Sequence, residues 1–447
     1  AFSLTVPDID LELDQHQISG MEMFRRGQIS GEVAFEPFVP RENKGGKLLQ
    51  FLLMNADVDL QVNSLAFINL FTRNFKTMKM DGTGTVKGHI HMERGHVLDE
   101  TELTVEADNL NVGFLTHVIK GNGEIHIGID PDEANQFDMD VLFNDVVMSH
   151  GGGQSLFSGL GLRLNYRTEA DFFQDSSETD DPGDAEPGAP KKPFQLEFEI
   201  PTVGISDVSV FNYYLPPASP FQFSSGTADL TVDILLQADD ADGLLSLKAD
   251  AMQARVDEQM IQTDFRADFT LVDGVPDDRF FDIRGTKFHF ENVKVDGEDE
   301  DFDQKNWAAL IEINQAELNF DSPFALKTEA ALTMTDSRPI VAVLGNQNDR
   351  PKWVKKMLTI EDVTGVVQLE MAENRILIPN AFIESEKIDF GAKGVIDEGL
   401  NDGVLYARYK KLDIVVKFSD GKRNIDLYRA KGKFDEYLLP SVTEQTH

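Results

Sequence analysis

The sequence predicts an all-β protein with a long antiparallel, curved and groove-like sheet, built from tandem meander repeats with a few short helices. The first observation is strict alternation of apolar and polar residues. In Thr227–Ile234, every second residue from Ala228 onward is apolar, and the residues between are Asp229, Thr231 and Asp233. A period of two is typical of a strand with one dry and one wet face. About twenty such stretches follow one another at short intervals, as in all-β architectures.

The second observation is a run of three such strands in the centre of the chain. The alternation of 227–234 returns in 245–251 and again in 265–271. Asp242-Gly243 is the dipeptide of a tight turn between the first two runs, and Asp273-Gly274 follows the third. These three strands predict an antiparallel meander.

The third observation is an internal repeat. Residues 58–69 and 203–212 have similar patterns, and a Gly-Thr pair follows each of them at Gly82-Thr83 and Gly226-Thr227. Asn69 and Asn212 are 143 residues apart, and Ala107 and Ala249 are 142 apart. Two anchors that agree within one residue favour a duplication of about 140 residues. Convergence of unrelated strands on similar chemistry is the alternative.

The first half reads as strands with one helical exception. Residues 1–14 alternate with a change of phase at Pro7, which predicts a kink or bulge. Residues 48–54 suit a buried strand or a short helix, and 65–75 suit one short helix at a sheet end. The other expected strands are 29–37, 83–92, 101–107, 123–129 and 137–148.

An acidic segment, 175–193, separates the two halves. It contains no apolar residue larger than alanine apart from proline, and such a composition predicts a disordered linker or loop. We therefore expect a first β repeat region at 1–174, a second at 194–440, and a flexible tail at 441–447.

The second half continues the β pattern with one interruption. Short helices are expected at 340–344 and 353–358, and the acidic stretch 296–303 is expected to be a loop. The expected strands are 281–296, 308–320, 325–335, 363–371, 375–383, 387–396, 403–417 and 423–433.

Composition limits the function. The net charge is −37, with 78 acidic against 41 basic residues; this repels phosphate and argues against nucleic acid as a partner. There is no cysteine, so disulfides and thiolate chemistry are excluded. No apolar run approaches the length of a membrane span. Because the chain begins Ala1-Phe2, we expect a processed chain or a fragment, whose membrane anchor was removed or never existed.

Candidate chemical groups are few. His89, His91 and His96 form a local cluster, but no carboxylate completes a metal site, and surface histidines are the simpler interpretation. Asp239–Gly243 and Glu298–Asp303 lack the spacing of a calcium loop and suit solvated turns. No nucleophile elbow, Walker loop or dinucleotide fingerprint occurs. We therefore expect no enzyme activity, no catalytic residue, no metal and no cofactor.

The continuous dry face is what remains. It can be buried against a second sheet, or the sheet can curl and leave an apolar groove that an acyl chain fills. The pattern does not separate these two arrangements. The residues expected to line such a groove are Ala228, Leu230, Val232, Ile234, Leu245, Leu247, Phe265, Phe269, Leu271, Phe288, Phe290, Ile311, Ile313, Val367 and Leu369.

Short motifs in the second half resemble the AsmA-like family of envelope proteins, which includes TamB and its relatives. The resemblance covers about residues 195–437. It rests on Val210-Phe-Asn-Tyr-Tyr-Leu-Pro216 with Ser225-Gly-x-Ala-x-Leu230, on Ser322-Pro-Phe324 with Arg338-Pro-Ile340 and Pro351-Lys-Trp353, and on Gly391-Ala-Lys-Gly394 with Asp420-Gly421.

The resemblance implies a sheet folded like a taco, in the periplasm of the cell envelope, along which phospholipid passes between inner and outer membranes during outer-membrane biogenesis. It also implies an inner-membrane anchor, here on a segment absent from this chain, and outer-membrane proteins as further partners. Our leading hypothesis is accordingly a non-enzymatic protein that binds and conducts phospholipid or another acyl-chain lipid. The alternative is a structural or assembly protein with a closed β core, which binds a protein partner through its sheet edges.

Overall fold

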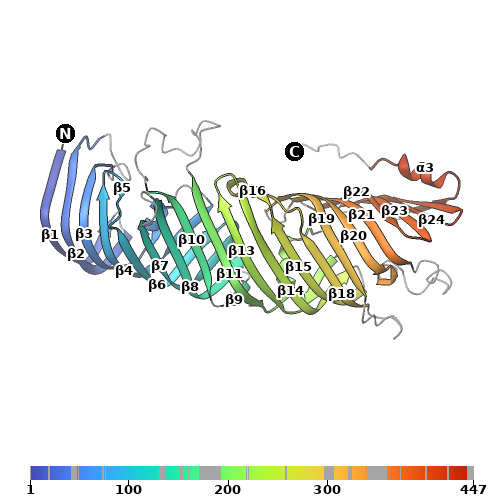
Figure 1. Cartoon of the computed structure of the whole chain (residues 1–447), viewed down its shortest axis with the longest axis horizontal. Coiled ribbons are helices and arrows are strands. Elements are labelled where there is room, and N and C mark those ends of the chain that lie inside the picture. The colour runs from blue at the N-terminus through green and yellow to red at the C-terminus, as the bar shows by residue number, and fades with distance from the viewer. Residues whose placement is uncertain are drawn as a thin grey trace. The chain divides into compact units, whose positions relative to one another are not determined.

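The computed structural model shows an all-β protein and confirms the predicted fold class (Figure 1). It describes residues 2–18, 21–41, 48, 50–72, 75, 77–129, 136–150, 155–159, 161–170, 193–217, 219, 221–256, 259–295, 307–320, 325–339, 360–372, 374–397, 400–419 and 422–439. The expected linker at 175–193, the tail at 441–447, the helices at 340–344 and 353–358 and the loop at 296–303 lie outside these residues, apart from Pro193 at the end of the linker.

The described residues form 26 strands and four short helices. The strands of the first half are β1 (Phe2–Ile18), β2 (Met21–Phe38), β3 (Leu52–Val62), β4 (Met78–Glu93), β5 (His96–Val97), β6 (Glu102–Phe114), β7 (His117–Ile129), β8 (Gln136–His150), β9 (Ser155–Gly159), β10 (Leu162–Glu169) and β11 (Phe194–Ile205). A 3₁₀ helix, η2 (Ala66–Leu70), lies within the segment expected to be helical.

The strands of the second half are β12 (Phe221–Ser225), β13 (Ala228–Gln237), β14 (Ala241–Val256), β15 (Gln259–Leu271), β16 (Asp273–Val275), β17 (Phe280–Asp282), β18 (Lys287–Val295), β19 (Ala308–Asn319), β20 (Ala325–Asp336), β21 (Glu361–Ala372), β22 (Arg375–Glu384), β23 (Ile388–Asp397), β24 (Leu400–Tyr409), β25 (Leu412–Ser419) and β26 (Lys422–Asp426). The helices are η3 (Val208–Tyr214), η4 (Pro276–Asp278) and α3 (Ala430–Asp435).

The chain divides into two compact units. Unit 1 comprises Ala1–Val203, Val232–Ala241 and Val275–Asp277, and unit 2 comprises Gly204–Thr231, Asp242–Gly274 and Asp278–His447. The strand β13 is divided between them.

Unit 1 is an antiparallel meander. Its strands pair in the order β1, β2, β3, β4, β6, β7, β8, β10 and β11, and β9 pairs with the second half of β8. The register of β1 and β2 shifts between Val6 and Ile9, which confirms the bulge expected at Pro7.

The middle strands of unit 1 share a line of bulges. The register shifts at Thr83/Gly84 between β4 and β6, between Ala107 and Leu110 in β6, and at Asn122/Gly123 in β7. Bulges bend a strand and increase its twist. At Gly121 a Cβ atom would lie 1.8 Å from the carbonyl oxygen of Asp145 on β8, so only glycine permits the backbones to approach this closely.

Contacts between distant strands show that the sheet of unit 1 folds over on itself. Phe114 on β6 stacks on Phe198 of β11 with ring centroids 5.1 Å apart, although β7, β8 and β10 lie between them in the sheet. In a flat sheet, strands four steps apart would be separated by about 19 Å. Phe75, which follows η2, packs between Phe114 and Phe194. The enclosed space is filled by side chains, and several of them are wholly inaccessible to solvent: Val105, Val112, Ile119, Ile125, Phe137, Met139, Val141 and Phe143.

Unit 2 is also an antiparallel meander. β14 pairs with both β12 and β15, and the order then continues through β18, β19, β20, β21, β22, β23, β24, β25 and β26. The short strand β17 pairs with the far end of β19. Strand order therefore follows chain order (Figure 1).

Four sequence predictions were wrong in detail. The expected strand 281–296 is two strands, β17 and β18, with a turn between them in which the amide of Thr286 donates to the carbonyl of Ile283. The turn before β14 lies at Ala238–Asp240, and the predicted turn residues Asp242-Gly243 are already inside the strand. Two hydrogen bonds fix the turn: the amide of Gln237 donates to the carbonyl of Asp240, and the Asp240 carboxylate accepts from the amide of Ala241. The expected strand 403–417 is two strands, β24 and β25. The expected strand 423–433 ends at Asp426, and α3 begins at Ala430, because Ala430 and Phe434 are spaced for one helical face and bury it.

Candidate functional site

One face of the unit 2 sheet carries a continuous row of apolar residues across ten strands. Directly opposed residues of an antiparallel pair share a face, so the pairing register alone defines this row. From β14 to β25 it contains Leu247, Ala267, Phe288, Ile311, Leu332, Gly365, Ile383, Phe390, Ala407 and Ile414. We call this side of the sheet the apolar face.

A second row lies beside the first on the same face, displaced by two residues along each strand. It contains Ile313, Ala330, Val367, Ala381, Ala392, Leu405, Val416 and Ile425. On the other side of the first row, Phe265 pairs with Phe290, and their rings are 5.1 Å apart. The apolar face is therefore several residues wide.

The structure brings eleven of the fifteen predicted groove residues onto this one face. Each of them either pairs directly with a residue of the apolar face on the neighbouring strand or lies two residues along its own strand from a residue that pairs in this way. They are Leu245, Leu247, Phe265, Phe269, Leu271, Phe288, Phe290, Ile311, Ile313, Val367 and Leu369. Phe269 adds an edge-to-face contact with Phe288, at a centroid distance of 5.4 Å.

The other four predicted residues lie on β13, the strand divided between the units. Ala228, Leu230 and Val232 are buried, and Ile234 is half-buried. These residues alternate with polar ones as the sequence predicts. Ala228 and Leu230 belong to unit 2, whereas Val232 and Ile234 belong to unit 1.

The opposite face is polar where β14 to β19 cross it. The hydroxyl of Ser246 donates to the Asp268 carboxylate at 2.8 Å, Arg266 pairs with the same carboxylate, and Lys287 pairs with Glu312 at 3.4 Å. Burial raises the pKa of Asp268, but the hydrogen bonds from Ser246 and Arg266 outweigh it and leave that pKa below its usual value. This side of the sheet is a solvated face of paired charges.

Towards the C-terminus the opposite face is covered by α3 (Figure 1). Phe434 and Ala430 of the helix pack on Val404, Tyr406 and Val415, all of which are at most 1 % exposed. Gly391 makes the approach possible, because a Cβ there would lie 2.6 Å from the Phe434 ring. The helix therefore covers the side of β23 to β25 away from the apolar face.

The apolar face of β22 to β25 has no such cover among the described residues. Ile383, Phe390, Ala392, Leu405, Ala407, Ile414 and Val416 are all half-buried. At one end of the strands the face is closed by a cluster of buried residues around Trp307, with Met334, Ile360, Val363 and Ile388. The indole nitrogen of Trp307 donates to the carbonyl of Asp336 at 2.9 Å, which fixes that cluster. The remainder is an apolar surface that water reaches.

Sequence reasoning did not assign the C-terminal part of this face. It recognised strands at 387–396 and 403–417, but it named no groove residue beyond Leu369. The sequence does show the alternation that marks Phe390, Ala392, Leu405 and Ala407. The nearby glycines Gly391, Gly394 and Gly403 make the difference between apolar and polar positions less clear there.

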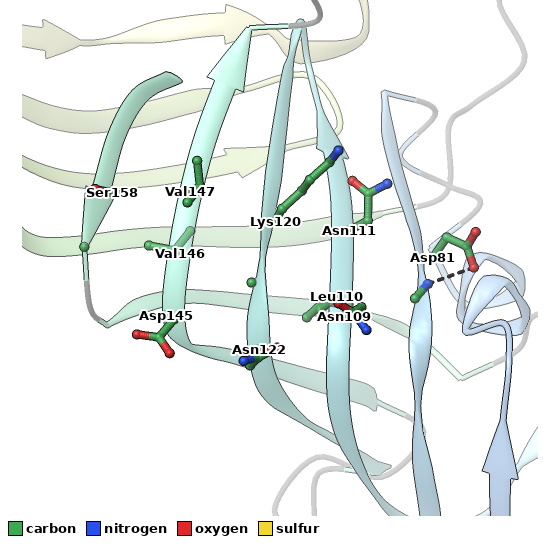
Figure 2. A pocket seen from close by; sticks show the side chains of 13 residues that line it. Asp81, Asn109, Leu110, Asn111, Lys120, Asn122, Asp145, Val146, Val147 and Ser158 are labelled. Atoms are coloured by element: carbon green, nitrogen blue, oxygen red, sulfur yellow. Dashed lines mark hydrogen bonds between the residues drawn. The ribbon is translucent and has the colours of Figure 1, made fainter. Parts of the chain in front are cut away.

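A second concave feature lies in unit 1, on the line of bulges. It is a hollow of about 830 Å³, lined by residues of β4, β6, β7, β8 and β9 (Figure 2). Its polar side chains, among them Asp81, Asn111, Lys120 and Asp145, are exposed and spread over neighbouring strands without converging on one point. The hollow follows from the bend of the strands and offers no focused ligand geometry.

The histidine cluster is engaged in ordinary surface contacts. His89 contacts Asp57 at 2.9 Å, and His91 contacts Glu100 at 3.2 Å. The part of the chain that the structure describes contains no group of three or more histidine, aspartate or glutamate side chains placed to hold a metal ion. Of the acidic stretch Asp239–Gly243, Asp239 and Asp240 lie in the turn before β14 and the other residues lie in β14, whereas Glu298–Asp303 lies outside the described residues. Among described residues, no helix has the length and apolar character to cross a bilayer.

Comparison of the chain with family models, curated proteins and solved structures found no match. The resemblance to AsmA-like proteins therefore stays a prediction, and the apolar face is the structural feature that bears on function.

Proposed function

We propose that the apolar face of unit 2 binds the acyl chains of lipids. The observation that supports this most directly is the half-buried, uninterrupted apolar surface of β22 to β25, opposite a face that α3 covers. Soluble proteins rarely expose a large contiguous apolar area unless something binds there. A flexible hydrocarbon chain suits a surface that contains almost no polar group.

The dimensions of the face suit a long, thin ligand. Ten strands at a spacing of about 4.8 Å give the first row a length of about 43 Å. The acyl region of one bilayer leaflet is about 15 Å thick. The row could therefore accommodate more than one acyl chain end to end, with headgroups at the open margin.

We further propose that the protein conducts phospholipid between the inner and outer membranes in the periplasm, without enzymatic chemistry. The continuity of the row favours conduction over a single closed site, because apolar residues follow one another on the same face from strand to strand. The family resemblance of residues 195–437 supports the location and the phospholipid class.

The rival proposal is a protein partner bound along a sheet edge. The last strand, β26, is short, and Lys422 and Arg423 on it are exposed. Charged residues and short strands are the features with which natural edges discourage pairing. The apolar face is therefore the better-supported site.

Two adjacent residues on β21 allow a matched test. Val367 lies on the apolar face, whereas Val366 points to the opposite side and is 41 % exposed. We expect Val367→Asp to weaken the binding of a fluorescent fatty acid to the detergent-free protein by tenfold or more. The reason is that the bound acyl chain would remove water from the new carboxylate, at a cost of about 2 kcal/mol or more. Val366→Asp should bind as the wild type does.

A second matched pair on β14 repeats the test at the other end of the face. Leu245 is on the apolar face, and Leu244 points away and is 61 % exposed. Far-UV circular dichroism establishes that each variant is folded. Equal binding by Leu245→Asp and Leu244→Asp, or by both β21 variants, would show that the face is not the binding site.

A further inference from the structure

The C-terminal end of the chain has a charge opposite to that of the whole. Residues 403–433 contain nine lysines and arginines and three aspartates, a net charge of +6 (9 − 3), in a chain whose net charge is −37. Some of these cations are used within the fold: Lys431 pairs with Asp435 at 2.9 Å, and Arg408 pairs with Asp389. Others face solvent.

Three of the solvent-facing cations form the basic part of this surface. Lys411, Lys422 and Arg423 are exposed. Within the described residues, no carboxylate lies within ion-pair distance of any of them. Lys422 and Arg423 begin β26, where Lys422 pairs with Ser419 at one end of β25, whereas Lys411 lies in the turn between β24 and β25, at the other end of that strand.

Exposed apolar side chains follow Arg423 along the same edge of the sheet, towards the end of β25 that Lys411 precedes. Ile425 is 67 %, Leu427 60 % and Tyr428 74 % exposed. They occupy the end of β26 and the turn that leads into α3. We call Lys422–Tyr428 with Lys411 the C-terminal tip.

The tip is held in this form by specific contacts. The Asp426 carboxylate accepts from the amide of Tyr428 at 2.9 Å and pairs with Lys433 of α3. The hydrogen bond from Lys433 is the main reason that the pKa of Asp426 is lowered. Arg429 takes the left-handed conformation, with φ of 49°, at the start of α3. The turn is thus fixed with Leu427 and Tyr428 pointing into solvent.

We propose that the C-terminal tip docks on a lipid bilayer that carries anionic headgroups. Lysine and arginine are attracted to such a surface, and leucine and tyrosine suit the boundary between headgroups and acyl chains. Charge complementarity favours the bilayer over neutral partners, and the exposed aliphatic Leu427 and Ile425 favour it over nucleic acid, which cations alone would bind.

The position of the tip connects it to the apolar face. Ile425 pairs with Val416 and extends the second row of that face to the last strand. Docking would therefore bring the end of the apolar face to the bilayer. That consequence rests on the proposed function, whereas the docking itself does not.

The test is co-sedimentation of the full chain with vesicles. One set contains phosphatidylglycerol and phosphatidylcholine in a one-to-two ratio, and the other contains phosphatidylcholine alone. We expect binding to the anionic set at about 0.1 M salt, and loss of most binding at about 0.5 M. Lys422→Glu with Arg423→Glu should weaken it by at least about tenfold. Leu427→Ser with Tyr428→Ser should also weaken it.

Lys87→Glu with Lys120→Glu is the matched control, because it makes the same change in net charge at exposed positions of unit 1. It should leave vesicle binding unchanged. The proposal is overturned if the wild type ignores anionic vesicles, if the control loses binding equally, if the serine variant binds normally, or if duplex DNA is bound in preference to the vesicles.

The same variants separate this proposal from the proposed function. The Lys422→Glu/Arg423→Glu protein should still bind the fluorescent fatty acid, and the Val367→Asp protein should still bind anionic vesicles. Fatty-acid binding without vesicle binding in the wild type would reject only the docking, and the reverse would reject only the acyl-chain site.

Discussion

Asn69 and Asn212 lie 143 residues apart and make the same pair of hydrogen bonds. The Asn69 amide donates to the carbonyl of Met80 and accepts from its N–H, both at 2.7 Å. The Asn212 amide bonds to the carbonyl and N–H of Phe223 at 2.7 and 2.8 Å. In both cases the partner is eleven residues further on, and each asparagine lies in a 3₁₀ helix.

The surroundings of the two asparagines also correspond. The amide of Leu65 donates to the carbonyl of Gly82, and the amide of Val208 donates to that of Gly226. These glycines are the ones that the sequence repeat aligns. The repeated meander therefore extends to individual backbone hydrogen bonds, which convergence of unrelated strands does not readily produce.

Removal of either asparagine side chain should destabilise its unit. Asn69→Ala leaves the N–H and C=O of Met80, a residue only 1 % exposed, without these partners. We expect a loss of about 1–3 kcal/mol in the free energy of unfolding. Urea unfolding measures this loss. The stability of Asn69→Asp should lie between those of the wild type and Asn69→Ala, because the aspartate can still accept a hydrogen bond from the N–H of Met80. Asn109→Ala, at an exposed position of the same unit, is the control; an Asn69→Ala protein as stable as that control would contradict the assignment.

The bend of unit 1 depends on Gly121. A Cβ at this position would meet the Asp145 carbonyl at 1.8 Å, so Gly121→Ala must push β7 and β8 apart. We expect a loss of about 1–3 kcal/mol, measured by the midpoint of urea unfolding. Gly113→Ala is the comparison, because its Cβ would have no neighbour closer than 3.7 Å. Equal midpoints for the two variants would show that the close approach at the bend is not required.

Acid should weaken unit 1 through His117. Burial and, to a smaller extent, the nearby His150, whose ring centroid is 5.7 Å away, together lower the pKa of His117 to about 4. Above pH 6.5 the side chain is neutral in both the folded and unfolded states, and stability is complete. Below pH 6.5 the unfolded chain takes up a proton that the folded chain does not, so stability falls until about pH 4, by about 3 kcal/mol in total.

The measurement compares urea midpoints at pH 7.5 and pH 4.5 for the wild type and His117→Gln; these two values bracket most of the expected interval. The many carboxylates titrate in both proteins, so only the difference between the two pH dependences reports on His117. The wild type should lose more stability than the variant. Parallel losses would mean that the histidine is protonated equally in both states.

Much of the fold could be predicted because alternation is a local property. The period of two in 227–234, 265–271 and 363–371 marks strands, and it also assigns faces, which is why Phe269, Phe288 and Val367 lie on one side of the sheet. The change of phase at Pro7 likewise predicted the bulge. Helix α3 was missed because Ile425 and Leu427 continue the β pattern up to the turn, and only packing on Tyr406 and Val415 selects the helix.

Whether the dry face is filled or open could not be predicted, because the same alternation serves both cases. Ile125 and Ile127 on β7 are at most 2 % exposed, whereas Leu405 and Ala407 on β24 are half-buried. The difference depends on the aromatic contacts made by Phe75, Phe114 and Phe198 within unit 1. Residues far apart in the sequence make those contacts, so no local sequence pattern predicts them.

The central claim is that the apolar face of unit 2 holds acyl chains. Mass spectrometry of organic extracts tests it most directly, with the protein purified without detergent. The account predicts phospholipid in stoichiometric or greater amount from the wild type and from Leu244→Asp, and a marked reduction from Leu245→Asp. A stable, monodisperse wild-type protein free of lipid would contradict it.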